Sequence, residues 1–552
     1  MRKKLNYLSA VFFAFVISIN AFGQSKEFEI SKNLDIYSTL FKQLHLNYVD
    51  PINPGQLNEE AIKAMLESLD PYTVYISESQ IEDYKFMTTG QYGGIGALIQ
   101  KRDDYVIISE PYEGFPADKA GLMAGDRILS IDGNSAKDKT ASQISELMKG
   151  QPGSSFEITV QRPNLVEELT KTIVREEIKI DNVPYYGMVE NNMAYIKLTN
   201  FTDNAGASVA KAYRELKTNE PAGLVLDLRD NGGGLLHEAV NIMDIFVDKG
   251  QTIVKTKGKL PDKNNTYKTT RSAIDEDIPV VVLINNRSAS ASEIVSGAMQ
   301  DLDRGVLVGE RTFGKGLVQN IMPLSYNTKA KITVAKYYIP SGRCIQEIDY
   351  SNGNDENGGY DKIPDSLIKA YQTLNGRKVY DGKGIRPDIE IGPEEASRIA
   401  MTLYAKSHIF DFATKFRQDH DTIASPLEFE ITSDMYDEFL AFLEGKEFEY
   451  TTETEKALEK LKDKAQSEKY WQFIQSHFEN LEQDLIEHKS NDLITFQEDI
   501  KELLRTEIVS RYYYQKGTIE ASLKNDKQLK KATEVLTNKT MYESILEGTF
   551  EE

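Results

Sequence analysis

The chain has 552 residues, of which 40% are apolar and 27% charged, and this is the composition of a globular protein, not of a disordered or fibrous one. It is too long for one ordinary hydrophobic core, so three or four domains are expected. The net charge of −21 argues against a nucleic-acid partner, which needs clustered basic residues. The single cysteine, Cys344, permits no internal disulfide.

The N-terminus has the pattern of a secretory signal peptide. Arg2, Lys3 and Lys4 precede an apolar run from Leu8 to Phe22, and small residues surround Gly23. This run of about fifteen residues is short for a membrane span, so cleavage after Gly23 is favoured over an uncleaved anchor. Residues 1–23 are therefore predicted to be removed. The mature protein is expected to be exported, and to be periplasmic or associated with the cell envelope.

Residues 24–87 are predicted to form an N-terminal helical region. Apolar residues recur there at helical spacing, in two stripes separated by Pro51 and Pro54. The stripes are Leu34, Ile36, Tyr37, Leu40 and Phe41, and then Ala61, Ile62, Met65 and Leu66. Nothing in this region suggests chemistry, so a packing role is expected.

A glycine-rich turn leads into a predicted strand within residues 88–176. The turn reads Tyr92-Gly93-Gly94-Ile95-Gly96-Ala97, and with the motif from Ala120 to Gly133 it resembles a PDZ domain. Glycines let backbone N–H groups converge on a carboxylate, while the following strand pairs with an extended peptide. The resemblance implies that Gly93, Gly94, Ile95 and Gly96 hold a substrate's C-terminal carboxylate. The alternative is a tight turn whose glycines only provide positive φ.

Predicted strands and helices alternate from residue 177 to residue 398, which indicates an α/β core. The apolar run at 223–229 leads into Asp230-Asn231-Gly232-Gly233-Gly234 and then into a helical pattern. A strand, a glycine turn and a helix N-terminus form an anion-binding geometry. The turn is not a P-loop, because the lysine and hydroxyl expected directly after such a loop are missing.

The strongest signal for chemistry lies between residues 278 and 320. An apolar run precedes Ser288-Ala289-Ser290-Ala291-Ser292-Glu293, and Thr312-Phe313-Gly314-Lys315-Gly316-Leu317-Val318-Gln319 follows a second strand. A serine between a buried strand and a helix start meets N–H groups that stabilise an anion. Lys315 can accept the hydroxyl proton if burial lowers its pKa. The pattern alone does not rank Ser288 against Ser290 as the nucleophile.

In residue type and separation, these two motifs resemble the signature of the carboxy-terminal processing, or tail-specific, proteases of serine peptidase family S41. The resemblance implies that Ser290 is the nucleophile, that Lys315 is the general base, and that Gln319, one turn beyond, orients the lysine. It also implies an oxyanion hole made by the N–H groups of Gly233 and Ala291, with the register among the three glycines open by one residue. The implied core is crotonase/ClpP-like, a mixed β-sheet with helices.

Three rival functions have weaker support. A Ser-His-Asp triad would use His237 with Asp227 or Asp230, but no Gly-x-Ser-x-Gly motif is present. A peptide-binding adaptor with a degenerate protease fold is disfavoured by the intact serine, lysine and glutamine. A hydrolase of small esters or lipids is disfavoured by the PDZ motif. No Cys/His cluster or His-Glu-x-x-His motif occurs, so no metal or other cofactor is expected.

Residues 399–552 carry helical stripes without glycine-rich turns, which predicts an α-helical C-terminal domain. This domain would cover or position the core, or pair with a second protomer. An acidic, solvated helical appendage is the alternative.

The predicted fold class is therefore an α/β core with a PDZ domain, an N-terminal helical region and a helical C-terminal domain. The predicted function is that of an exported serine endopeptidase with a Ser290–Lys315 dyad. The expected partners are protein or peptide substrates with exposed C-terminal tails, and no nucleic acid is expected. An activating adaptor protein and a homo-oligomer formed through the C-terminal helices are both compatible with the sequence.

Overall fold

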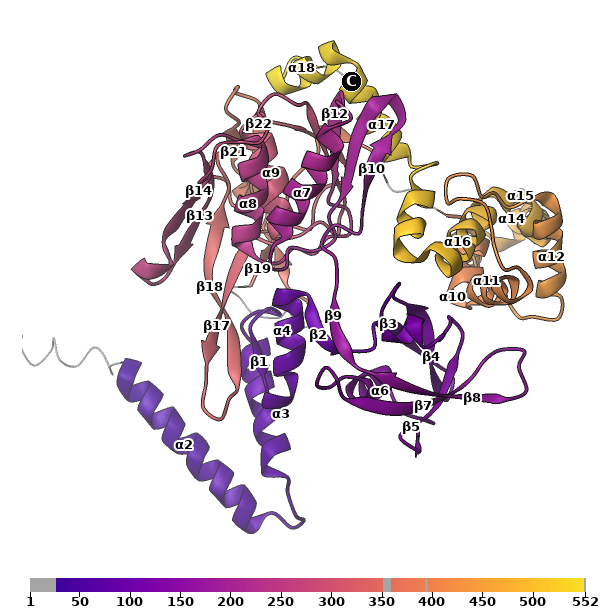
Figure 1. Cartoon of the computed structure of the whole chain (residues 1–552), viewed down its shortest axis with the longest axis horizontal. Coiled ribbons are helices and arrows are strands. Elements are labelled where there is room, and N and C mark those ends of the chain that lie inside the picture. The colour runs from indigo at the N-terminus through magenta and orange to yellow at the C-terminus, as the bar shows by residue number, and fades with distance from the viewer. Residues whose placement is uncertain (1–25, 351–358, 393–395, 551–552) are drawn as a thin grey trace, which may run out of the picture. The chain divides into compact units, whose positions relative to one another are not determined.

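The computed structural model describes residues 26–350, 359–392 and 396–550 (Figure 1). The predicted signal peptide, 1–23, lies outside the described residues. The chain divides into two compact units, residues 1–75 and residues 76–552. Across the described ranges, no helix is both long and apolar enough to cross a bilayer.

The described part of the first unit, residues 26–75, contains the helices α2 (Lys26–Asn47) and α3 (Pro54–Glu67), as the helical periodicity predicts. Asn53 caps α3, because its side-chain oxygen accepts hydrogen bonds from the backbone N–H groups of Gly55 and Gln56. Pro54 occupies the first helical turn, where its missing N–H has no intrahelical role. The short strand β1 (Val74–Ile76) spans the boundary between the two units.

The second unit begins with a short helical segment and the PDZ module. Helix α4 (Ile81–Thr89) follows the 3-10 turn η1 (Glu78–Gln80). The PDZ sheet has the order β3-β4-β5-β7-β8, with β6 beside β5. Its strands are β3 (Ala97–Arg102), β4 (Tyr105–Pro111), β5 (Arg127–Ile131), β6 (Asn134–Ser135), β7 (Ser155–Gln161) and β8 (Glu168–Val174). Helices α5 (Pro116–Lys119) and α6 (Ala141–Met148) complete the module. A separate antiparallel pair, β2 (Gln91–Gly94) and β9 (Glu176–Lys179), flanks it.

The predicted α/β core is a six-stranded mixed sheet of order β10-β11-β12-β15-β16-β23. The first pair is antiparallel and all the later pairs are parallel. The strands are β10 (Tyr185–Val189), β11 (Met193–Lys197), β12 (Gly223–Asp227), β15 (Val280–Ile284), β16 (Val306–Gly309) and β23 (Ile389–Glu390). Every residue of β12 and β15 is buried, as expected for parallel strands covered on both faces.

Side chains of this sheet alternate between two hydrophobic cores. Leu224 and Leu226 pack with helices α7 (Ala205–Lys217), α8 (Leu236–Phe246) and α9 (Ala291–Asp301) on one face. Val225, between them in the strand, packs on the opposite face against the last helices of the chain. Those helices are α17 (Lys527–Thr537) and α18 (Lys539–Glu547).

Further strands extend from the α/β core. An antiparallel sheet contains β13 (Thr252–Gly258), β14 (Asn265–Lys268), β17 (Leu317–Pro323) and β18 (Lys329–Tyr338). Two small hairpins are β19 (Ile348–Asp349) with β20 (Asp361–Lys362), and β21 (Ala370–Gln372) with β22 (Lys378–Tyr380). The 3-10 turns of this region are η2 (Glu190–Asn192), η3 (Pro261–Lys263) and η4 (Asp365–Leu367).

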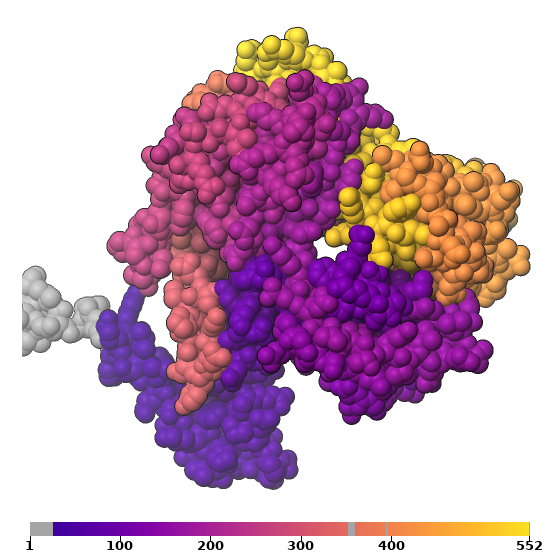
Figure 2. Space-filling model, in the orientation of Figure 1, coloured from indigo at the N-terminus to yellow at the C-terminus, as the bar shows by residue number. Residues whose placement is uncertain are grey.

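The helices of the predicted C-terminal segment pack into two separate hydrophobic cores. Five of its helices contribute to a cluster of their own, which includes Phe412, Phe439 and Ile508. They are α10 (Arg398–Ala405), α11 (His408–Asp419), α12 (Ser433–Leu443), α15 (Asp492–Thr495) and α16 (Gln497–Ser522). Helices α13 (Glu453–Ser467) and α14 (Trp471–Ser490) pack against each other. Helices α17 and α18 instead cover the six-stranded sheet. In Figure 2 the yellow end of the chain accordingly lies in two places.

Polar contacts fix α17 to the six-stranded sheet. The Arg229 guanidinium, just after β12, lies 2.6 Å from a carboxylate oxygen of Asp227 and 2.6 Å from one of Asp526, at the start of α17. Asp227 is buried and also lies 3.1 Å from the Lys197 ammonium. Burial alone would raise the pKa of Asp227, but the two neighbouring cations hold it below its ordinary value. The carboxylate therefore stays charged and keeps both cations in place.

Candidate active site

Ser290 lies between strand β15 and helix α9, at the N-terminal end of a helix whose residues are all buried. Its backbone has φ 56° and ψ −112°, outside the regions that L residues usually adopt. Such strained conformations concentrate at functional sites, where the surrounding structure holds them. In the first turn of α9 the Ser292 N–H donates to the Ala289 carbonyl at 3.2 Å, so the Ala291 N–H is the donor that an anion formed at Ser290 would meet first.

The structure distinguishes Ser290 from its two neighbouring serines. The buried Ser288 hydroxyl donates to the Leu228 carbonyl at 2.9 Å and accepts from the Asn285 N–H at 3.0 Å. The buried Ser292 hydroxyl donates to the Asn231 carbonyl at 2.8 Å. Ser290 is half-buried. The hydroxyls of Ser288 and Ser292 therefore hold the turn before α9 against the loop that follows β12. The residue pattern alone could not separate these two serines from Ser290.

Alanine at Ser288 or Ser292 is expected to weaken the fold and to spare the chemistry. Each change removes a buried hydrogen bond. Ser288→Ala also leaves the Asn285 N–H without its acceptor, whereas the Asn231 carbonyl keeps the Ala289 N–H after Ser292→Ala. The free energy of unfolding should therefore fall by about 1–3 kcal/mol for Ser288→Ala and by about 1 kcal/mol for Ser292→Ala. Thermal unfolding and peptide cleavage, measured on both variants, check this expectation. Complete loss of cleavage in a folded Ser292→Ala protein would assign that hydroxyl a direct role.

Glu293 is a central residue of the site that the sequence reasoning missed. One carboxylate oxygen accepts from the N–H groups of Ser290 and Lys315, at 2.8 and 2.9 Å. The other accepts from the Gly314 N–H at 2.8 Å and from the Thr312 hydroxyl at 2.6 Å. Complete burial raises the pKa of Glu293 to about 7, although these hydrogen bonds favour the charged form. In the sequence, the available signal for this role was the spacing of a capping box, in which a glutamate follows a helix-start serine by three residues.

Tyr337, on strand β18, makes a second connection between the two candidate catalytic residues. Its buried hydroxyl lies 2.6 Å from the Lys315 carbonyl and 3.2 Å from the Ser290 carbonyl. Glu293 therefore holds the N–H groups of Ser290 and Lys315, and Tyr337 contacts their carbonyls. The structure thus brings the backbones of Ser290 and Lys315 together through two buried side chains.

Gln319 lies on the extended strand β17, and the expectation that it stands one helical turn beyond Lys315 is wrong. Its side-chain amide donates to the Thr333 hydroxyl at 3.2 Å, across the β17–β18 pair. A register shift between Val318 and Gln319 locally bends this ladder. The orienting role of Gln319 stays a prediction.

The glycine loop after β12 lies directly against the nucleophile turn. Gly233 has φ +95°, and a Cβ there would lie 2.6 Å from the Ala289 carbonyl oxygen and 2.8 Å from the Ser290 Cβ. Only glycine permits this approach. Its N–H donates to the Asn231 side-chain oxygen at 2.9 Å, so the oxyanion role assigned to Gly233 would require Asn231 to release it. That role and the role of Ala291 stay predictions.

The histidine and the two aspartates of the alternative Ser-His-Asp triad have other partners. His237 is exposed on α8, and its nearest carboxylate is Glu238 at 3.4 Å. Asp227 is bound by Arg229 and Lys197, as described above. Asp230 accepts from the Asn285 side-chain amide at 3.0 Å. Within the part of the chain that the structure describes, no hydrogen bond links His237 to Asp227 or Asp230, which disfavours a Ser-His-Asp triad.

The predicted carboxylate-binding loop divides between a strand and a turn. Gly93 and Gly94 lie in β2 and pair with Glu177 and Glu176 of β9. A Cβ at Gly93 would lie 2.1 Å from the Gly150 carbonyl oxygen, so close backbone packing requires this glycine. These two positions belong to a ladder and not to the open turn that the sequence predicts.

Ile95 and Gly96 form the turn itself, between β2 and β3. Gly96 has φ +69°, which glycine adopts readily. The carbonyls of Ile95 and Gly96 accept from the N–H groups of Ala117 and Tyr112, at 2.8 and 2.9 Å. Carboxylate binding by the four residues 93–96 stays a prediction.

Comparison with known proteins agrees with this arrangement. Residues 192–351 match the model of peptidase family S41, and residues 107–162 match that of a PDZ domain. Residues 399–536 match a model described as the C-terminal helical domain of a probable PDZ-protease.

Individual relatives are similar to this chain over most of their own length. A carboxy-terminal-processing protease of Bartonella bacilliformis is 34% identical over 354 residues, which are 63% of this chain and 81% of that protein. A probable CtpA-like serine protease of Staphylococcus haemolyticus is 30% identical over 438 residues, covering 79% of this chain and 80% of that protein. Among solved structures, the photosystem II D1 C-terminal processing protease is 29% identical, with a TM-score of 0.36, over 64% of this chain and 87% of that chain.

The family-model matches and the two relatives of Bartonella bacilliformis and Staphylococcus haemolyticus define a protease with a PDZ domain and a C-terminal helical domain. The chain belongs to peptidase family S41, the family of the carboxy-terminal processing proteases.

Proposed function

We propose that this protein is an exported serine endopeptidase that cleaves other exported proteins near C-terminal tails held by its PDZ domain. Ser290 is the nucleophile and Lys315 the general base. The observation that carries this proposal is the double connection of their backbones through Glu293 and Tyr337, at the N-terminal end of α9. The direct test is cleavage by Ser290→Ala and Lys315→Ala variants.

In the proposed mechanism, neutral Lys315 accepts the proton of the Ser290 hydroxyl while the Ser290 oxygen attacks a peptide carbonyl. The tetrahedral oxyanion is stabilised by the Ala291 N–H and by an N–H of the glycine loop after β12. The protonated lysine then gives its proton to the leaving amine. A water molecule, activated by the same lysine, hydrolyses the acyl-enzyme and releases Ser290. Gln319 helps to orient the lysine.

The same proposal includes export directed by residues 1–23 and action in the periplasm or cell envelope. The proposal also holds that the fold of the core is related to the crotonase/ClpP-like fold. An activating adaptor protein and a homo-oligomer formed through the C-terminal helices are compatible with this function.

Two observations support tail recognition by the PDZ domain. Strand β3 starts directly after the Ile95–Gly96 turn, so a peptide added along it would end at the turn. Helix α6 packs beside β3 and has Ile144 and Met148 on its buried face. Both side chains belong to the hydrophobic core of the module, so this contact fixes α6 beside the strand that would receive the peptide.

Amidation of a substrate's C-terminus is expected to raise KM by about 10- to 100-fold, because it removes charge-assisted hydrogen bonds to the turn. The value of kcat at saturation should change little, since the scissile bond is unaltered. Steady-state kinetics on peptides that differ only in the terminal carboxylate or amide measure both constants. Equal KM values for the two peptides would contradict carboxylate recognition.

A further inference from the structure

The loop that carries Lys315 is held through the backbone of the lysine and of the glycines on both sides of it. The N–H groups of Gly314 and Lys315 donate to Glu293, and the Lys315 carbonyl accepts from the Tyr337 hydroxyl, as described above. Tyr337 also donates its backbone N–H to the Gly316 carbonyl at 2.9 Å. These bonds leave the Gly314 carbonyl and the Gly316 N–H for another partner.

That partner is the segment 346–347, which follows strand β18 along the chain. The Gln346 side-chain oxygen accepts from the Gly316 N–H at 2.8 Å, and the Glu347 N–H donates to the Gly314 carbonyl at 2.9 Å. Every backbone N–H and C=O group from Gly314 to Gly316 therefore has a partner. The partners come from helix α9, strand β18 and this segment.

The two glycines allow the segment to approach this closely. A Cβ at Gly316 would lie 2.8 Å from the Gln346 backbone nitrogen. Gly314 has φ +87°, and a Cβ there would lie 2.7 Å from the Glu347 Cβ. Both distances are too short for a carbon atom, so the loop fits the segment only with glycine on each side of the lysine.

Gln346 is itself fixed at both ends of its carboxamide. The residue is only 3% exposed, and its side-chain NH₂ donates to the Ile348 carbonyl at 2.9 Å. Because only the amide oxygen can accept from an N–H, the bond to Ile348 keeps that oxygen facing Gly316.

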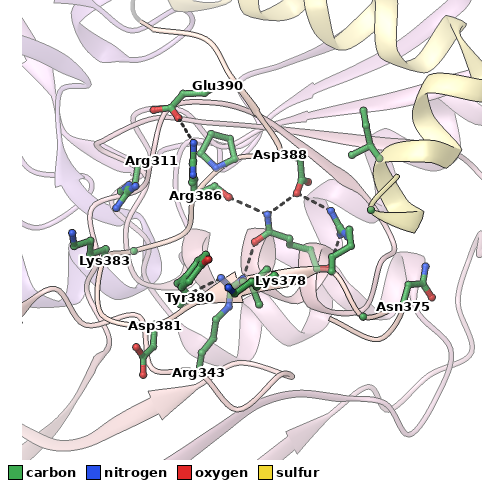
Figure 3. A pocket seen from close by; sticks show the side chains of 18 of the residues that line it. Arg311, Arg343, Asn375, Lys378, Tyr380, Asp381, Lys383, Arg386, Asp388 and Glu390 are labelled. Atoms are coloured by element: carbon green, nitrogen blue, oxygen red, sulfur yellow. Dashed lines mark hydrogen bonds and ion pairs between the residues drawn. The ribbon is translucent and has the colours of Figure 1, made fainter. Parts of the chain in front are cut away.

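Arg343 anchors the start of the same segment on helix α9. Its buried guanidinium donates to the Gln300 side-chain oxygen at 2.7 Å and to Asp301 at 2.8 Å, at the C-terminal end of that helix. It also donates to the Tyr380 carbonyl at 3.2 Å, and Figure 3 shows these two residues side by side. The segment 343–347 therefore connects the end of α9 to the loop of the lysine.

We propose that Gln346 is a positioning residue for the general base, because its hold on the Gly316 N–H sets the place of the Lys315 backbone relative to the Ser290 hydroxyl. This inference rests on the proposed function, which assigns the chemistry to Ser290 and Lys315. A base must lie within hydrogen-bonding reach of the proton that it accepts. A displacement of about 1 Å in such a geometry can lower the rate by about 10²-fold.

The first test is Gln346→Met, which keeps the length of the side chain and removes the acceptor. The value of kcat on a peptide substrate should fall by about 10- to 100-fold, because the loop of Lys315 loses one of its holds. KM should change by less than about twofold, since the contacts of the substrate are unaltered. Denaturant unfolding identifies conditions under which the variant is fully folded, and kcat is measured there.

Rescue by the conservative variant separates positioning from a general effect on the fold. Gln346→Glu keeps an oxygen for the Gly316 N–H and loses only the donor to Ile348. Each enzyme is assayed at the pH of its highest kcat, because a new carboxylate near the loop would favour the protonated lysine. The kcat of Gln346→Glu should lie within about threefold of the wild-type value. Equal losses in Gln346→Met and Gln346→Glu would overturn the proposal.

A second variant separates the loop from Gln346 without changing the glutamine. Gly316→Ala places a Cβ against the Gln346 backbone and should lower kcat by a similar factor. Since both changes break the same contact, the double variant should be little slower than either single one. Losses that multiply in the double variant would overturn the proposal.

The matched control is Gln528→Met. Gln528 is a buried glutamine of α17 that accepts from Arg229 at 3.0 Å and donates to the Ile391 carbonyl at 2.9 Å. Its substitution should lower the free energy of unfolding and leave kcat unchanged. A wild-type kcat in folded Gln346→Met, or an equal fall of kcat in Gln528→Met, would overturn the positioning role. A wild-type protein that cleaves no peptide would instead overturn the proposed function, and this inference with it.

Discussion

Replacing Ser290 by alanine is expected to reduce peptide cleavage by about 10⁴-fold or more, because the attacking oxygen is removed. The fold should survive, since the contacts of residue 290 with Glu293 and Tyr337 use its backbone N–H and carbonyl. Cleavage of an unfolded protein with an apolar C-terminus, measured beside thermal unfolding, checks both expectations.

Lys315→Ala is expected to give a loss of similar size, because the hydroxyl then lacks a base. Its backbone contacts with Glu293 and Tyr337 are likewise retained. Lys336→Ala is the matched control, since this lysine is exposed on β18 and should be dispensable. Activity that survives Lys315→Ala would point to another base and reopen the triad hypothesis. A wild-type protein without activity would direct the search to an activating partner.

The sequence predicts the local framework of the active site well. An apolar run followed by small residues predicts the turn from β15 to α9, because both signals lie within about twenty residues. The spacing of the serine and lysine motifs predicts their pairing only through the family resemblance. The structure adds the physical reason, which is that Glu293 and Tyr337 hold the two segments together.

The parts that the sequence did not predict depend on contacts between distant segments. Tyr337 lies 47 residues after Ser290, and no local pattern shows that its hydroxyl returns to the Ser290 carbonyl. Gly93 and Gly94 resemble an open turn because their ladder partner, β9, lies far along the chain. Helical periodicity likewise predicts that α17 has an apolar face but not that this face covers the protease sheet.

The second large effect is expected from Glu293→Gln. An amide offers one oxygen where the carboxylate offers two, and its NH₂ group would face N–H groups that need an acceptor. Either the Ser290 or the Lys315 segment must then shift. A displacement of about 1 Å in a catalytic geometry can lower the rate by about 10²-fold, so kcat should fall by this factor with little change in KM.

Glu238→Gln is the matched control for this change. Glu238 is a buried carboxylate on α8 that accepts from the N–H groups of Asn204 and Gly206, at 3.2 and 2.7 Å. Its substitution should weaken the fold and leave kcat unchanged, because neither Ser290 nor Lys315 depends on it. An unaltered kcat in a folded Glu293→Gln enzyme would show that this carboxylate does not set the catalytic geometry.

Glu293 should also make stability depend on pH in a defined direction. Its pKa is about 7 in the folded protein and 4.5 ordinarily, so between these values the folded state holds a proton that the unfolded state releases. The contribution of this group is therefore full below pH 4.5 and is lost as the pH rises to about 7. Relative to Glu293→Gln, which does not titrate, the wild-type free energy of unfolding should fall by about 3 kcal/mol across this window. Denaturant unfolding of both proteins at several pH values measures the difference, and a constant difference would mean that Glu293 stays ionised in the fold.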